Sequence, residues 1–124
     1  MKTDLPVVTA VVSQTGQFDA LSLRQNNDYP VIEIFDDYYR IVDELGDPIL
    51  YPKNYFIDCE IPLPDGWLCR HDEYGESQLC PPEFSQRAFF DFHSEGDPEM
   101  IRKFREFCNN HGIRLPNGNG DKRE

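Results

Sequence analysis

The sequence lacks any long hydrophobic run. No stretch of about 18 apolar residues, the least that a membrane-spanning helix needs, occurs among its 124 residues. The first residues, MKTDLPVVTAVVS, hold one lysine and a short apolar run that Asp4 and Pro6 interrupt, unlike a secretory signal peptide. We therefore expect no membrane partner and a cytoplasmic location, where the four cysteines stay reduced.

Positive charge is also scarce. Only 12 Lys and Arg residues stand against 23 Asp and Glu residues, and the net charge is -11 at pH 7. Such a surface repels the phosphates of nucleic acids and anionic lipids, so direct nucleic-acid binding is not expected. It would attract a basic protein, although surplus acidic charge on small domains more often serves solubility alone.

Sequence motifs of common enzymes are missing as well. The chain contains no Gly-rich phosphate loop, no Gly-x-Ser-x-Gly nucleophile motif and no His-Glu-x-x-His zinc motif. Its carboxylates are numerous, but abundance alone does not make a catalytic pair. We therefore expect neither catalysis nor a cofactor.

The segment YPVIEIFDDYYRIVDELGDPILYP, residues 29–52, predicts a three-stranded meander. A first turn at Asp36-Asp37 is acceptable because Asp tolerates a positive φ. It places Glu33 opposite Arg40 as a cross-strand charge pair. The face turned to the core would carry Ile32, Ile34, Tyr39 and Ile41, with Ile32 opposite Ile41 and Val31 opposite Val42.

A second turn, with Leu45-Gly46 at its tip, would continue the meander. It places Ile41 opposite Leu50, so that Ile41 keeps apolar neighbours on both sides. Pro48 has no N–H group and therefore suits the outer strand.

These residues, with KNYF after them, resemble small bacterial SH3-like barrel domains. Such domains read roughly Y-x-V-[ILV], a tight turn, Y-Y/F-R-I-[IV]-D, an acidic-Gly turn, Y-L-Y-P and an aromatic residue. The resemblance covers about residues 5–61 and implies a fold but little chemistry. The Ala-Leu-Tyr-Asp-Tyr stretch of eukaryotic signalling SH3 domains does not occur, so binding of proline-rich peptides is not implied.

Short strands and turns are expected in most other segments. Strands are predicted at 6–13, 56–61 and 87–92, a shorter one within 18–23, a helical turn at 51–56 and a hairpin at 67–80. If this hairpin turns at Tyr74-Gly75, Cys69 lies opposite Cys80. The same register places His71 opposite Gln78.

One helix is predicted, at 97–111. Asp97 is a good N-cap, Pro98 occupies the first helical position and Gly112 can close the C-terminal end. The apolar side would carry Met100, Ile101, Phe104, Phe107, Cys108 and His111, and the polar side Arg102, Arg105, Glu106 and Asn109.

The predicted fold is therefore α+β and mainly β. An SH3-like small barrel over 5–61 would be extended by a β-hairpin and a strand over 62–96 and by the amphipathic helix at 97–111. Because the helix has an apolar side to bury, we expect a single domain over 1–114, followed by a flexible tail at 115–124.

Five thiol and imidazole groups raise the question of a zinc site. They are Cys69, His71, Cys80, Cys108 and His111, and zinc takes about four ligands. Their spacing matches no common zinc motif. We favour the alternative without a metal, in which Cys108 and His111 belong to the apolar side of the helix and the other two cysteines are buried in strands. A Cys69–Cys80 disulfide would need an oxidising compartment.

Tyrosines and carboxylates gather in the predicted turns. Amphipathic aromatic rings are enriched at protein interfaces, and carboxylates around them would steer a basic partner. The candidate partner-binding residues are Asp37, Tyr38, Asp43, Glu44, Asp47, Tyr51, Trp67 and Tyr74. Alternatively, the rings close the ends of a small barrel.

The function predicted from these features is that of a non-enzymatic, acidic protein-binding module. An immunity-type inhibitor or an adaptor that covers a basic protein fits the size and charge. The alternative is a DNA mimic, whose carboxylates imitate phosphates and block a DNA-binding protein. A zinc protein or thiol enzyme built on the Cys and His residues is the third and weakest hypothesis.

Overall fold

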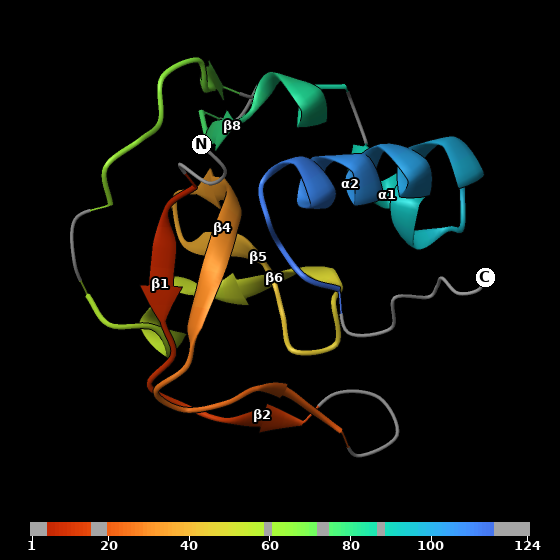
Figure 1. Ribbon diagram of the computed structural model, residues 1–124. Coiled ribbons are helices and arrows are strands. Elements are labelled where there is room, and N and C mark those ends of the chain that lie inside the picture. Colours follow the sequence, from red (N-terminus) through yellow and green to blue (C-terminus); the bar gives the residue numbers. More distant parts are fainter. Residues whose placement is uncertain (1–4, 16–19, 59–60, 72–74, 87–88, 116–124) are drawn as a thin grey trace.

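The computed structural model describes residues 5–15, 20–58, 61–71, 75–86 and 89–115, and these form an α+β fold that is mainly β (Figure 1). The strands are β1 (Val7–Thr9), β2 (Gln14–Thr15), β3 (Leu21–Leu23), β4 (Asp28–Phe35), β5 (Tyr38–Val42), β6 (Pro48–Pro52), β7 (Leu68–His71) and β8 (Ser77–Cys80). The helices are α1 (Phe89–Ser94) and α2 (Pro98–Asn110), with short 3-10 helices η2 (Lys53–Tyr55) and η3 (Pro82–Phe84). The expected α+β class is confirmed.

Strand β4 lies at the centre of the main antiparallel sheet. The order is β6-β5-β4-β8-β7, and β1 also pairs with β4, while β2 and β3 form a separate two-stranded sheet. The helices α1 and α2 lie together beside the main sheet (Figure 1). In the described part of the chain the sheet ends at β6 and β7 and does not close, so the SH3-like barrel stays a prediction.

The β4–β5 hairpin follows the expected register only near its turn. Glu33 pairs with Arg40, as predicted. Beyond it the register shifts, so that Val31 instead of Ile32 lies opposite Ile41. This irregularity is a β-bulge, in which two residues of one strand oppose one residue of the other. As a result Ile32 packs toward the helices, while Val31 packs on the other face of the sheet.

The β5–β6 register is also one residue away from the predicted one. Ile41 pairs with Ile49, and Leu50 lies opposite Arg40. Gly46 adopts a φ of 81°, as in a three-residue hairpin loop that ends in a left-handed residue. The expected two-residue tip is therefore wrong, and Leu50 is 39% exposed instead of facing the core.

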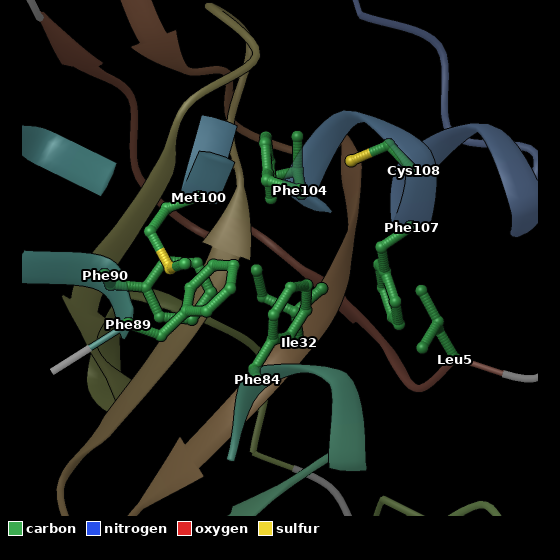
Figure 2. Close-up of a cluster of buried hydrophobic side chains, with 10 residues drawn as sticks. Leu5, Ile32, Phe84, Phe89, Phe90, Met100, Phe104, Phe107 and Cys108 are labelled. Carbon is green, nitrogen blue, oxygen red and sulfur yellow. The ribbon is translucent and has the colours of Figure 1, made fainter. Parts of the chain in front are cut away.

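Two hydrophobic clusters occupy the two faces of the sheet. One holds Val8, Ala10, Leu23, Tyr29, Val31, Ile34, Tyr39, Ile41, Tyr51 and Phe56. The other holds Leu5, Ile32, Val42, Phe84, Phe89, Phe90, Met100, Phe104, Phe107 and Cys108 and joins the sheet to both helices (Figure 2). Burial of a side chain of this size contributes roughly 1.5–3 kcal/mol, so the aromatic-rich second cluster is the main reason why α2 packs on the sheet.

The strand predicted at 87–92 is wrong, because Phe89–Ser94 is helical. A strand would turn Phe90 and Phe92 to the same face, yet Phe92 is 42% exposed. The helix instead buries the consecutive rings of Phe89 and Phe90, each 5.0 Å from the ring of Phe84. Residues 87–88 lie outside the described part of the chain.

Helix α2 matches its prediction in detail. The Asp97 carboxylate accepts the N–H groups of Glu99 and Met100, at 2.9 and 3.1 Å. At the other end Gly112 has a φ of 74°, and the N–H of Ile113 donates to the carbonyl of Cys108 at 2.8 Å. This arrangement closes the last turn and directs the following chain back toward the sheet.

The strands at both ends of the predicted barrel are shorter than expected. The strand predicted at 6–13 is limited to β1, and the one predicted at 56–61 is limited to an isolated bridge between Phe56 and Ala10. Residues 57–58 are not in a strand, and residues 59–60 lie outside the described ranges. The helical turn predicted at 51–56 is present as η2.

Candidate functional site

The predicted partner-binding residues separate into two groups at opposite ends of β5. Asp37 and Tyr38 are exposed at the start of this five-residue strand. Asp43, Glu44 and Asp47 lie in the loop after its end. A strand rises by about 3.3 Å per residue, so the two groups lie at opposite ends of β5 and do not form one compact cluster.

Asp43 points into the protein, so the expectation that it faces solvent is wrong. It is only 6% exposed. Its Oδ1 accepts the N–H groups of Leu45 and Asp47 at 3.0 and 3.1 Å, and its Oδ2 accepts the hydroxyl of buried Tyr51 at 2.9 Å. Burial raises the pKa of Asp43 above its usual value. Asp43 and Tyr51 therefore hold the β5–β6 loop together.

Glu44, the next residue, is half-buried, and its pKa is lowered instead of raised. Its Oε2 accepts the Tyr29 hydroxyl at 2.6 Å and the Asn27 side-chain amide at 2.8 Å. The hydrogen bond from Tyr29 is the main cause that lowers the pKa of Glu44. The exposed Arg24 lies 3.6 Å from Oε1. Asn27 was not predicted as part of a site, since only the tertiary fold brings it beside Glu44.

Trp67 and Tyr74 were also predicted to bind a partner. Trp67 is half-buried and packs against both hydrophobic clusters, so most of its ring serves the core. Tyr74 lies outside the described residues.

A groove opens where the main sheet extends beyond the C-terminal end of α2. We call it the α2-end groove; its volume is about 480 Å³. Val7, Pro30 and Val42 supply its apolar lining, which we call the floor, and His111–Arg114 after the end of α2 line it as well. In Figure 1 the chain that leaves α2 runs down toward the β5–β6 loop. Three acidic residues also line it, namely Asp28, Asp43 and Glu44.

A second groove, of about 470 Å³, lies between η3 and α2. Its charged residues include Arg102 and Glu106, which are 2.7 Å apart. Arg102 also lies 2.7 Å from Glu99. Because these charges neutralise one another at the surface, this groove has no clear preference for a charged ligand.

A buried ion pair connects the sheet to α1. Arg40 Nε lies 2.6 Å from the Glu33 carboxylate, and both side chains are largely buried. The Gln78 side-chain amide also donates to Glu33. The Arg40 guanidinium lies 4.3 Å from the centre of the Phe90 ring. With every charge balanced and covered, the pair serves structure and offers no site to a ligand.

The β7–β8 hairpin separates the cysteines that were expected to face each other. Cys69 pairs with Leu79, and Cys80 pairs with Leu68. Since neighbouring residues of a strand point to opposite faces, Cys69 and Cys80 lie on opposite faces of the hairpin. The predicted register, with His71 opposite Gln78, is therefore off by one residue.

The thiols and imidazoles do not converge. Cys108 is buried in the helix-side cluster, and the His111 ring lies 4.2 Å from that of Phe107. Burial raises the pKa of Cys80 to about 11 and that of Cys108 to about 12, which disfavours reactive thiolates. Within the described ranges no three potential metal ligands of the Cys, His, Asp or Glu type lie together.

The outer edge of β6 offers little to an added strand. The N–H of Asp43 donates to the carbonyl of Asp47 at 3.1 Å, and bonded pairs alternate along an antiparallel ladder. The outward-directed backbone positions of β6 are therefore Pro48, Leu50 and Pro52. Two of these three have no N–H group, which is a common protection of sheet edges.

No helix in the described part of the chain is long and apolar enough to cross a membrane. No family model matches the sequence, and neither the curated proteins nor the solved structures contain a match.

Proposed function

We propose that this chain is a non-enzymatic, acidic protein-binding module whose partner is a basic protein, as for an immunity-type inhibitor or an adaptor. The observation that carries the proposal is the distribution of charge over the described residues. Most of the positive side chains are used in contacts within the chain, whereas many carboxylates are exposed without an ion pair.

The engaged cations are mostly arginines. Arg40 is paired with Glu33, and Arg102 with Glu99 and Glu106. Arg24 and Lys103 also lie within 4.0 Å of carboxylates, and Arg70 donates hydrogen bonds to Gln78 and Ser85. Among the described cations, those without an ion pair or side-chain hydrogen bond are Lys53, Arg105 and Arg114.

The surplus carboxylates face solvent. Nine exposed acidic residues form no ion pair within the described ranges, namely Asp28, Asp36, Asp37, Asp47, Asp58, Asp65, Glu83, Asp91 and Glu95. Unpaired surface charge of one sign raises the rate of encounter with an oppositely charged protein and makes that rate depend on salt. A basic partner is the one that this distribution favours.

Binding of a labelled hexa-arginine peptide, followed by fluorescence anisotropy, tests this proposal with a defined probe. The Kd should rise at least about tenfold between roughly 0.05 and 0.5 M salt, because salt screens exposed charges. A hexa-glutamine peptide is the control and should not bind. If hexa-arginine binds no better than hexa-glutamine at low salt, the proposed function is wrong.

The SH3-like relationship of residues 5–61 belongs to the same proposal. It is supported by the β4–β5–β6 meander and by η2 after it, which coincide with the segments that carry the resemblance. A DNA mimic remains a prediction that a partner protein would test, since duplex DNA should then compete with this chain for that partner.

A further inference from the structure

We propose that the α2-end groove receives a cationic side chain of a basic peptide, with the aliphatic stem over the apolar floor and the charged head against the carboxylates of Asp28 and Glu44. The proposal rests on the proposed function, because it names the place where the basic partner inserts.

The shape and floor suit a long amphipathic side chain. The volume of about 480 Å³ falls within the range of roughly 300–1,000 Å³ that is usual for ligand sites. Val7 on the floor is 50% exposed, so its apolar surface is open to an occupant. Lysine and arginine bury an apolar stem along such a surface while their charged heads stay near polar groups.

The two carboxylates are held in place and leave acceptor oxygens for a ligand. At Glu44, Tyr29 and Asn27 occupy Oε2, whereas Oε1 has only the long contact of 3.6 Å with exposed Arg24. At Asp28, Oδ1 accepts the Thr9 hydroxyl at 2.5 Å. Its other oxygen has no hydrogen bond from a described residue. A guanidinium or ammonium group supplies the donors that these oxygens lack.

The end of α2 adds negative potential to the same groove. The last turn of α2 carries no basic side chain, and a helix C-terminus bears about half a negative charge. Asp43 lines the groove too, although its oxygens are already bonded within the loop. Against these stand two arginines, namely the exposed Arg114, which lines the groove, and Arg24, which lies 3.6 Å from Glu44. The balance favours a cation and opposes an anionic or purely apolar occupant.

Charge removal at matched positions provides the first test, with hexa-arginine as the probe and the full 124-residue chain. Asp28→Asn with Glu44→Gln removes two charges from the groove and keeps an oxygen at each position. Asp36→Asn with Asp37→Asn removes the same charge from an exposed turn outside the groove. The groove variant should raise the Kd about tenfold, and the turn variant less than about threefold, since exposed pairs contribute little individually.

Filling the groove provides a second test that leaves the charge unchanged. Val7→Trp should occupy the floor and weaken binding of hexa-arginine at least about fivefold, an effect of roughly 1 kcal/mol. Val11→Trp is the matched control, because Val11 is also exposed but does not line the groove. The amide signals that shift on titration in ¹⁵N spectra should belong to residues 7, 28–30, 42–44 and 111–114.

The outcomes separate the two proposals. If wild type binds hexa-arginine and both charge variants weaken it equally, or if Val7→Trp binds as well as Val11→Trp, the groove proposal is overturned while the general affinity for basic partners stands. If wild type does not bind the peptide at all, both proposals fail. Loss confined to the groove variants, with unchanged far-UV circular dichroism, supports the groove.

Discussion

Replacement of Asp43 by alanine should cost far more stability than replacement of any exposed carboxylate. The mutation removes the acceptor of three hydrogen bonds, from the N–H groups of Leu45 and Asp47 and from the hydroxyl of Tyr51. The Tyr51 hydroxyl is buried, and a buried donor without an acceptor costs about 1–3 kcal/mol.

Loss of the hydrogen bonds from the N–H groups of Leu45 and Asp47 costs less, about 0.5 kcal/mol each, because water can reach these groups in a partly exposed loop. The expected loss in the free energy of unfolding is therefore about 3 kcal/mol. For a chain of this size such a loss lowers Tm by roughly 10 °C.

Urea denaturation followed by fluorescence measures this effect. Asp43→Asn keeps one oxygen for the amides but replaces the acceptor of the Tyr51 hydroxyl by an NH₂ group, so it should cost about 1–3 kcal/mol and less than Asp43→Ala. Asp37→Ala removes an exposed carboxylate and should change stability by less than about 0.5 kcal/mol. If Asp43→Ala is as stable as Asp37→Ala, the hydrogen bonds of Asp43 do not hold the loop and the reasoning fails.

Four further outcomes are expected. Because the pKa of Asp43 is raised in the folded protein, the stability that its protonated form contributes is complete below pH 3.8 and is lost as pH rises through the raised pKa. The difference in the free energy of unfolding between wild type and Asp43→Asn should therefore narrow as pH rises above 3.8. The pKa of Glu44 is lowered in the folded protein, so its ionised form contributes stability above pH 4.5 that is lost as pH falls through the lowered pKa. The free energy of unfolding by which wild type exceeds Glu44→Gln should therefore disappear at low pH. Arg40→Met leaves the buried carboxylate of Glu33 without its cation and should cost about 3–5 kcal/mol, whereas Arg40→Met with Glu33→Gln should recover at least half of that loss; equal stability of the single and double variants would contradict the role of the pair. Phe84→Ala should cost about 3–5 kcal/mol, because this ring is almost fully buried among four other rings; a loss below about 1 kcal/mol in urea denaturation would show that the aromatic cluster does not hold α2 to the sheet.

Features that depend on neighbouring residues could be predicted from the sequence. The cap at Asp97, the closing Gly112 and the apolar side of α2 follow from local rules and agree with the structure. The pairing of Glu33 with Arg40 is equally local, since it is set within a few residues of the turn. Errors of one residue began where a bulge or a loop residue with positive φ entered the ladder, as at Ile32 and Gly46.

The segment around Phe89 shows why short apolar runs are ambiguous. Its aromatic residues fit a strand or a helix equally well over so few positions. The choice was made by the contacts of Phe89 and Phe90 with Phe84, which comes from η3. No local preference encodes such a contact.

The sequence by itself determined the acidic surplus, the mainly β class and the single well-capped helix α2, because composition, periodicity and capping act within a few residues. It did not determine which carboxylates face solvent. Asp43 and Glu44 are adjacent and both line the groove, yet the oxygens of Asp43 are bonded within the protein, whereas Oε1 of Glu44 has only a 3.6 Å contact with Arg24. Only the packing of α2 on the sheet brings Val7, Asp28 and Ile113 together, because residues so far apart in the chain become neighbours through burial of the shared aromatic cluster.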